Sequence, residues 1–317
     1  MKSYISRRIF IAIPTFFGIT ILVFLVSSLA SGSPLELLLS NQNISEAEIE
    51  RQKIKLGLDQ PIYIQYFKWI SNLLTGNLGE SYRTMQPVMD LIISGLGATF
   101  LLAITAVILA CLISLPLGIQ SARYQNKAWD NISSIFSFFA TSTPSFFLAL
   151  IFLYFFSVKL RILPIGGMFD AGQDSTILSL LKHLIMPSLV LSFHMIGTLI
   201  QFIRSSMLEV MKEDYVRTAK AKGLKERVVI IKHVLRNSLI PVVTYLGMEI
   251  PLLLGGAVVT EQVFSWPGLG LLMIKSIAAR DYPVVLGITV LVAVAVLVFN
   301  IITDLIYGLL DPRIRYD

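Results

Sequence analysis

The chain has 317 residues, of which 55% are hydrophobic and only 15% are charged, and its mean hydropathy is +0.75. Because a soluble domain carries about 25% charged residues, this composition excludes an ordinary soluble protein. The net charge of +6 does not indicate a nucleic-acid partner, since the basic residues lie mainly in short loops beside apolar runs, as they do in membrane proteins.

Six apolar segments of about 20 residues follow one another, each long enough to cross a hydrocarbon core roughly 30 Å thick. The sequence therefore predicts an all-α fold, a polytopic membrane protein with six transmembrane helices. The expected spans lie at about 9–30, 98–122, 132–158, 183–203, 239–261 and 284–307.

Residues 1–30 form the first predicted transmembrane helix, which begins behind Lys2, Arg7 and Arg8. A cleaved signal peptide is the alternative, but the apolar core of such a peptide has about 7–15 residues, and this run is longer. We expect the helix to be retained, with its N-terminus in the cytoplasm.

Residues 31–97 are more polar and are predicted to form a small extracytoplasmic segment with two helices. Ser45 and Glu48 have the spacing of a capping box, so a helix is expected over 46–55. An amphipathic helix is expected over 62–74. Its aromatic residues suit a position at the membrane interface: Tyr63, Tyr66, Phe67 and Trp69.

Residues 98–317 contain the other five predicted spans, which form the core of the protein. Six spans place both termini on one side of the membrane. That side would hold sixteen of the 26 Lys and Arg residues, nine of them between Arg204 and Arg236. By the positive-inside rule, both termini and the segment 204–238 are predicted to be cytoplasmic.

The segment 204–238, called the coupling region below, is charged and helical between two apolar spans. Apolar residues recur at helical spacing over 207–219, Gly223 is typical of a left-handed helix end, and a second helix is expected to begin near Glu226. We interpret the region as a docking surface for a soluble cytoplasmic partner, and the alternative is a loop that lies on lipid headgroups. Small residues would allow another surface to approach closely: Ala219, Ala221 and Gly223.

The sequence "RTAKAKG" in this region, followed by "HVLRNSLIP", resembles the cytoplasmic coupling motif of ABC importer permeases, in the variant of the oligopeptide and dipeptide family. The general motif begins Glu-Ala-Ala and has a glycine six residues after its Glu, which corresponds to Arg217, Thr218, Ala219 and Gly223 here. The resemblance implies that an ATPase subunit is contacted through the following residues: Asp214, Tyr215, Arg217, Thr218, Ala219, Ala221, Gly223 and Leu224.

The resemblance covers almost the whole chain and is to the B-type permease subunit of these importers. The matching segments, in order, are "YISRRIFIAIPTFFGITILVFLV", "LGLDQPIYIQYFKWISNLLTGNLGES", "PSFFLALIFLYFFSVKLRILPIGG", "GGAVVTEQVFSWPGLGLL" and "NIITDLIYGLLDPRIRYD". It implies a type I ABC importer permease fold in a bacterial plasma (inner) membrane. It also implies a second homologous permease subunit, two ATPase subunits, an extracytoplasmic substrate-binding protein and a peptide substrate.

The chain has no GxxxxGK[ST] sequence and hence no phosphate-binding loop of that type, so we expect a non-catalytic subunit. ATP and Mg²⁺ would be bound by the partner ATPase subunits, and no cofactor or metal is expected here. Within the family, nickel or a nickel chelate, glutathione and oligosaccharides stay open as alternatives to di- or oligopeptides. An intramembrane hydrolase is the alternative from another class, with Ser142, Ser145 and His194 as its candidates.

Glu249 lies near the centre of the fifth predicted span, where a charged side chain costs about 2.5–3.5 kcal/mol. Such a residue either lines a water-filled path or pairs with the partner permease, and both interpretations stay open. Tyr245, Glu249, Gly256 and Thr260 fall near one helical face of this span, which Pro251 is expected to bend. Together with His194 of the fourth span, they are the predicted residues of the translocation path.

Overall fold

The computed structural model describes residues 2–29, 51, 54, 57, 59–170, 172 and 176–310. Over these ranges the chain is helical and contains no strand, apart from one isolated bridge between Glu80 and Pro87. The predicted all-α fold is confirmed. The helix predicted over 46–55, with its cap at Ser45, falls almost entirely outside the described residues.

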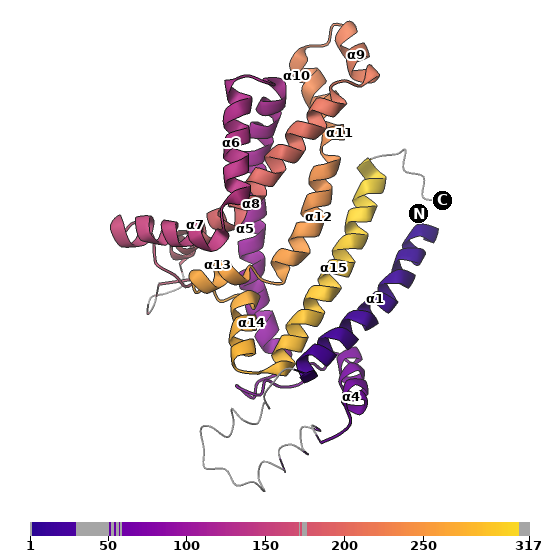
Figure 1. The fold of residues 1–317 in the computed structure, drawn as a ribbon, viewed down its shortest axis with the longest axis vertical. Coiled ribbons are helices and arrows are strands. Elements are labelled where there is room, and N and C mark those ends of the chain that lie inside the picture. Colours follow the sequence, from indigo (N-terminus) through magenta and orange to yellow (C-terminus); the bar gives the residue numbers. More distant parts are fainter. Residues whose placement is uncertain are drawn as a thin grey trace.

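Four helices in the described part of the chain are individually long and apolar enough to cross a membrane. They are α1 (Lys2–Leu29), α5 (Val88–Arg123), α8 (Ile177–Val210) and α15 (Tyr282–Leu310). Two further spans result if each of two bent helix pairs is taken as one. Figure 1 shows the long helices running in broadly the same direction, with α5 and α8 side by side along much of their length. The six predicted segments thus correspond to four long helices and two bent helix pairs, one bent between Ser142 and Ser145 and the other, by 45°, between Ser238 and Ile240.

The third predicted span, 132–158, is not a continuous helix. It consists of α6 (Ala128–Ser142), α7 (Ser145–Phe152) and the π-helix η1 (Leu153–Lys159), with a bend of 100° between α6 and the rest. Pro144 causes the break, because proline has no backbone N–H and forces the preceding residue, Thr143, into an extended conformation. As a result α7 projects sideways from the bundle (Figure 1).

The fifth predicted span, 239–261, is also wrong as a single helix. The helix α12 (Ile240–Leu254) ends at a turn through Gly255 and Gly256, and a short helix, α13 (Val258–Val263), follows. Gly256 has φ of +100°, a conformation that L-residues other than glycine rarely adopt. The chain then continues through α14 (Leu269–Ala278) to α15.

The remaining predicted segments and the observed helices can be compared by their first and last residues. The second span begins at Val88 rather than at 98, so α5 enters the segment assigned to 31–97. Its 36 residues would measure about 54 Å at 1.5 Å per residue, well beyond a hydrocarbon core. The amphipathic helix predicted over 62–74 is confirmed as α4 (Ile62–Leu74).

The helix α4 packs against α1 through aromatic side chains. The rings of Tyr66 and Trp69 each lie 5.5 Å from the ring of Phe24, and the hydroxyls of Tyr66 and Thr20 are 3.0 Å apart. The interface-type aromatics therefore hold the two helices together, while Tyr63 and Phe67 remain exposed.

The loop that follows α4 is tied to the start of α15 by the buried carboxylate of Asp281. Its Oδ1 accepts a hydrogen bond from the backbone N–H of Tyr82 at 2.9 Å, and its Oδ2 accepts one from the hydroxyl of Ser81. Ser81 also accepts from the N–H of Thr84 at 3.0 Å. This network fixes a tight turn at the end of the bundle opposite α9 (Figure 1).

A second buried carboxylate, that of Glu261 in α13, joins α13 and α14 to α5. Its Oε1 accepts from the hydroxyl of Thr99 at 2.8 Å, and its Oε2 accepts from the backbone N–H of Leu271 at 2.9 Å. The Thr99 oxygen in turn accepts from the N–H of Leu269 at 2.8 Å. A carboxylate suits this place because the first N–H groups of α14 lack partners inside the helix and carry partial positive charge.

Glycines make this arrangement sterically possible. A Cβ on Gly268 would lie 2.4 Å from Oε1 of Glu261, and a Cβ on Gly256 would lie 2.3 Å from the backbone nitrogen of Gly270. The indole N–H of Trp266 donates to the carbonyl of Ala98 at 2.9 Å. The segment "TEQVFSWPGLG" therefore folds as one buried unit against α5.

We predict that Thr99→Val destabilises the protein, since valine has the same shape but can neither donate to Glu261 nor accept from Leu269. The loss should be about 1–3 kcal/mol, the cost of leaving buried polar groups unpaired. Thermal unfolding of the detergent-solubilised protein measures it. Thr99→Ser keeps the hydroxyl and should unfold close to the wild-type temperature. Equal melting temperatures of the valine variant and the wild-type protein would contradict the stabilising role of the Thr99 hydroxyl.

Candidate functional site

The coupling region, residues 204–238, forms a projecting end of the molecule. It comprises the last turns of α8, then α9 (Asp214–Ala221), α10 (Glu226–Val228), the π-helix η2 (Val229–Leu235) and α11 (Arg236–Ser238). Figure 1 shows α9 and α10 beyond the ends of the neighbouring helices. The second helix begins at Glu226, as predicted.

The helix predicted over 207–219 is wrong in its continuity. The helix α8 runs on to Val210, a turn follows, and α9 starts afresh at Asp214. The turn separates two packing directions, because Met207 on α8 and Val216 on α9 are both fully buried in one hydrophobic cluster. Val216, which the helical pattern did not single out, is the main apolar anchor of α9.

The structure divides the predicted ATPase-contacting residues into two groups. Ala219 is buried, with 5% of its surface exposed, and packs in the same cluster as Val229 and Val234 of η2. It supports α9 from beneath and is not available to a partner, contrary to the prediction from its small size. Tyr215 is partly buried, and its hydroxyl accepts from the amide of Asn237 at 2.7 Å. The others form an exposed surface: Asp214, Arg217, Thr218, Ala221, Gly223 and Leu224.

Gly223 terminates α9 as the sequence predicts. Its φ is +76°, and its N–H donates to the carbonyl of Lys220 at 3.0 Å. A side chain at this position would meet no other atoms within 4 Å. The glycine is therefore required by backbone conformation and not by lack of space.

Two charged contacts brace the coupling region against the bundle. Arg123, at the end of α5, donates to both carboxylate oxygens of Glu226, at 2.9 and 3.1 Å. Asp130, at the start of α6, is 2% exposed and accepts two hydrogen bonds from Arg204 of α8, one of them at 2.8 Å. Ser121 of α5 donates to the same carboxylate at 2.6 Å.

The sequence analysis missed this pairing. A signal was present, because Arg204 closes an apolar span and a cation at that depth requires a partner. Asp130 is 74 positions away, however, and nothing local in the sequence connects the two residues.

A cavity of about 330 Å³ lies beside α8, α12 and α13. It brings together three of the predicted path residues, His194 of α8, Glu249 of α12 and Thr260 of α13. The break between α6 and α7 adds two hydroxyl residues, Thr143 and Ser145. The remaining lining residues are small or apolar: Val190, Leu191, Met195, Ala257, Val258 and Val259.

Glu249 is half-buried in this cavity. Among the described residues, no hydrogen bond or ion pair holds its carboxylate, and His194 is close enough to act on it electrostatically. The carboxylate therefore faces the cavity without a fixed cation from the residues that the structure describes.

Two predicted path residues lie elsewhere. Tyr245 packs in the main hydrophobic cluster, with its ring 5.7 Å from that of Phe202. Gly256 lies against the start of α14. The predicted common face required one helix through residue 260, and it is lost because α12 ends at Leu254. Thr260 reaches the cavity from a different helix.

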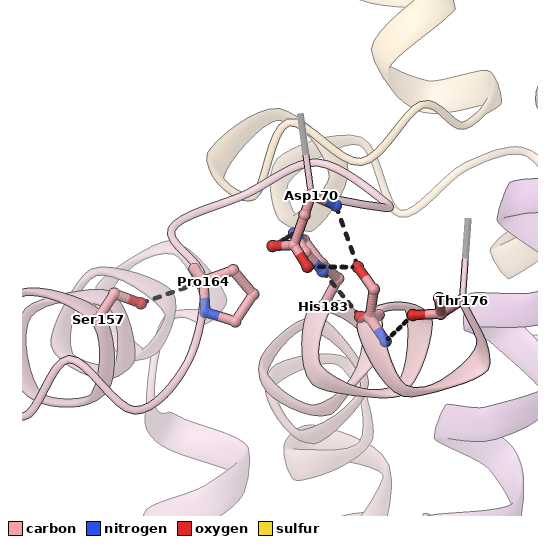
Figure 2. Close-up of polar contacts among 6 residues, drawn as sticks. Ser157, Pro164, Asp170, Thr176 and His183 are labelled. Carbon is pink, nitrogen blue, oxygen red and sulfur yellow. Dashed lines mark hydrogen bonds and ion pairs between the residues drawn. The ribbon is translucent and has the colours of Figure 1, made fainter. Parts of the chain in front are cut away.

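A separate serine, aspartate and histidine cluster lies at the start of α8 (Figure 2). The hydroxyl of Ser179 donates to Oδ2 of Asp170 at 2.8 Å and accepts from the Asp170 N–H at 3.0 Å. The Nδ1 atom of His183 lies 2.8 Å from the carbonyl of Ser179, not from a hydroxyl, and its Nε2 is 3.9 Å from Asp170. Thr176 caps the helix. These contacts anchor a loop and do not form a nucleophile–base pair.

The candidate hydrolase residues are not arranged for catalysis either. Ser145 and His194 line the cavity without a hydrogen bond between them, and Ser142 does not line it. Within the described residues, no group of three metal-ligating side chains surrounds His194 or any other position.

Comparison with known proteins gives consistent matches along the chain. A family model described as binding-protein-dependent transport system inner membrane component matches residues 114–316, and the model of its N-terminal part matches residues 1–103. An oligopeptide transport system permease protein of Bacillus subtilis is 43% identical over all of both chains. A glutathione transport system permease protein of Escherichia coli O6:H1 is 38% identical, again over the full length of both.

A similar fold is found among the solved structures. An inward-facing form of the MetNI methionine ABC transporter matches with a TM-score of 0.54 and 15% identity over 70% of this chain and 97% of that one. At this identity the match supports the fold alone, and it agrees with the permease fold expected from the sequence.

Proposed function

We propose, from the premise that this chain belongs to the family of binding-protein-dependent transport system inner membrane components, that it is one of two permease subunits of an ATP-driven peptide importer. The observation that carries the proposal is the full-length identity of 43% to an oligopeptide permease protein. The chain itself is non-catalytic. Its partners are a second homologous permease, two ATPase subunits that bind ATP and Mg²⁺, and a substrate-binding protein.

The exposed surface of α9 and the turn after it form the contact with an ATPase subunit. Asp214 and Arg217 are 93% and 79% exposed at their side chains, so they are available to a partner. Val216 and Ala219 hold the helix from beneath. The contacts of Arg123 with Glu226 and of Arg204 with Asp130 connect the coupling region to α5 and α6, which a transmitting element needs. A loop that only lies on lipid headgroups would not require this connection.

The coupling region and both termini face the cytoplasm in this proposal. Their relative placement supports it, because the start of α1, the end of α15 and α9 all lie toward the same end of the molecule (Figure 1). The basic residues concentrated between Arg204 and Arg236 agree with the positive-inside rule. The protein is accordingly a multi-pass component of a bacterial plasma membrane, with α4 on its outer side.

The cavity that contains Glu249 belongs to the translocation path, which the partner permease completes. Closure of the ATPase pair moves the coupling regions, and the path opens alternately to the two sides. Substrate arrives from the binding protein at the end opposite α9. Peptides are favoured over nickel chelates because the full-length relatives include an oligopeptide permease protein, and over glutathione because the identity to the glutathione relative is lower.

The proposed orientation predicts the labelling of single cysteines. In a Cys111→Ala background, Thr84→Cys should react with a membrane-impermeant thiol reagent on intact cells, and Lys225→Cys should react only after permeabilisation. Both positions are exposed, so access and not burial decides the result. Labelling of both cysteines on intact cells would contradict the six-span topology.

The docking role predicts that Ala221→Arg releases the ATPase. Ala221 is exposed, so the arginine should leave the melting temperature of the permease unchanged while it keeps the partner surface away. Co-purification of the ATPase subunits should fall about 10-fold or more. The matched control is Ala128→Arg, an exposed alanine in the first turn of α6. Normal ATPase retention by the Ala221 variant would argue against docking at α9.

The transport function itself predicts ATP-dependent peptide uptake by the complete complex in proteoliposomes. Labelled di- and oligopeptides should accumulate only when the binding protein and ATP are both present. Unlabelled peptide should compete, whereas a nickel chelate or glutathione in equal excess should not. Preferential competition by either of these two compounds would replace the peptide assignment.

A further inference from the structure

We propose that Glu249 binds the free α-ammonium group of the peptide substrate within the cavity beside α8, α12 and α13. The proposal rests on the importer function above and adds a specificity-determining residue to it. Its starting point is the carboxylate of Glu249, which lines the cavity and has no hydrogen-bonding or ion-pairing partner in the described part of the chain.

An unpaired carboxylate at this depth is unfavourable, because burial removes water without returning an equivalent interaction. Buried charges in proteins are therefore paired or hydrogen-bonded. His194 is the neighbouring titratable group, but an imidazole is not a permanent cation. A counter-charge for the ionised carboxylate would therefore come from outside the described residues, and the cavity is the open side of the carboxylate.

The other lining groups suit an ammonium ion. An ammonium has three N–H donors and no acceptor, so it needs several oxygen atoms around it. Glu249 supplies a charged acceptor, and Thr143 and Ser145 at the break between α6 and α7 supply hydroxyl oxygens on the same cavity. None of the lining residues is Lys or Arg, so the described wall of the cavity carries no permanent positive charge that would repel a cation.

The size of the cavity agrees with recognition of one end of a peptide. Ligand pockets span roughly 300–1,000 Å³, and this one, at about 330 Å³, is at the small end of that range. The α-ammonium is present on every unmodified peptide, whatever its side chains. A carboxylate that binds this group would therefore accept peptides of varied sequence. The apolar lining residues would select little among peptide side chains.

The test compares one peptide with a free N-terminus and the same peptide N-acetylated, in the reconstituted complex with a single binding protein. Both peptides carry a C-terminal amide and are supplied at saturating concentration. Glu249→Gln should lower the maximal uptake rate of the free peptide about 10-fold, the effect of losing a charge-assisted hydrogen bond, and change that of the acetylated peptide less than about 2-fold. Val259→Ala, a change at an apolar residue that lines the same cavity, should preserve the wild-type ratio.

Equal losses for both peptides, or no loss for either, would overturn the proposal. Failure of the Gln variant to assemble with the second permease would also overturn it, and would assign Glu249 to an ion pair with that subunit. If the wild-type complex transports neither peptide, the proposed importer function fails instead, so the two failures are distinguishable.

A second measurement does not depend on transport of the acetylated peptide. A water-soluble carbodiimide activates a carboxylate, and a neighbouring amine then displaces the activating group as a urea and forms an amide. In a peptide-saturated complex held without ATP hydrolysis, mass spectrometry should find the free peptide attached to Glu249 and no adduct with the acetylated one. Absence of the adduct in a complex that transports the free peptide would contradict the proposed contact.

Discussion

The arrangement around the cavity depends on one buried carboxylate, that of Glu261. It is inaccessible to solvent, and it joins the hydroxyl of Thr99 on α5 to the first N–H groups of α14. This bond network determines where the short helix α13 lies, and the residues 257–260 that lead into it form one wall of the cavity. The turn at Gly255 and Gly256, which ends α12 just beyond Glu249, brings the chain back to this position.

The same helix, α5, is held at its other end by a different set of charges. Ser121 contacts the Asp130 carboxylate that binds Arg204, and Arg123 holds Glu226 of the coupling region. The exposed pair of Arg123 and Glu226 contributes little to stability. Its role is to hold the coupling region in a defined position relative to α5. A displacement of the coupling region would therefore be passed to α5 and α8 together, and α5 extends to the cavity wall held by Thr99.

The sequence predicts those features that depend on composition and local pattern. The apolar runs located α1 and α15, the amphipathic pattern located α4, and the lone glycine after "RTAKAK" predicted the end of α9. It did not predict the breaks at Pro144 and Gly255, because both interrupt runs that remain apolar on either side. Two hydrogen-bonded pairs could not be predicted from the sequence, because only the tertiary structure brings their members together. Asp130 and Arg204 are 74 positions apart, and Thr99 and Glu261 are 162 positions apart. Glu249, His194 and Thr260 line one cavity, and the broken helix, not a common helical face, brings Thr260 to the other two.

Glu249 and Glu261 differ in whether the fold supplies partners for their carboxylates. Both are carboxylates in the apolar second half of the chain, and composition alone does not separate them. Glu261 is fully buried and its two oxygens accept from a hydroxyl and from backbone amides at a helix start, so its charge is compensated permanently by the fold. Glu249 is half-buried, lines an open cavity and has no such donors among the described residues. A compensated carboxylate stabilises one structure. An uncompensated one leaves an acceptor on the cavity wall, and the substrate ammonium proposed above would supply its counter-charge.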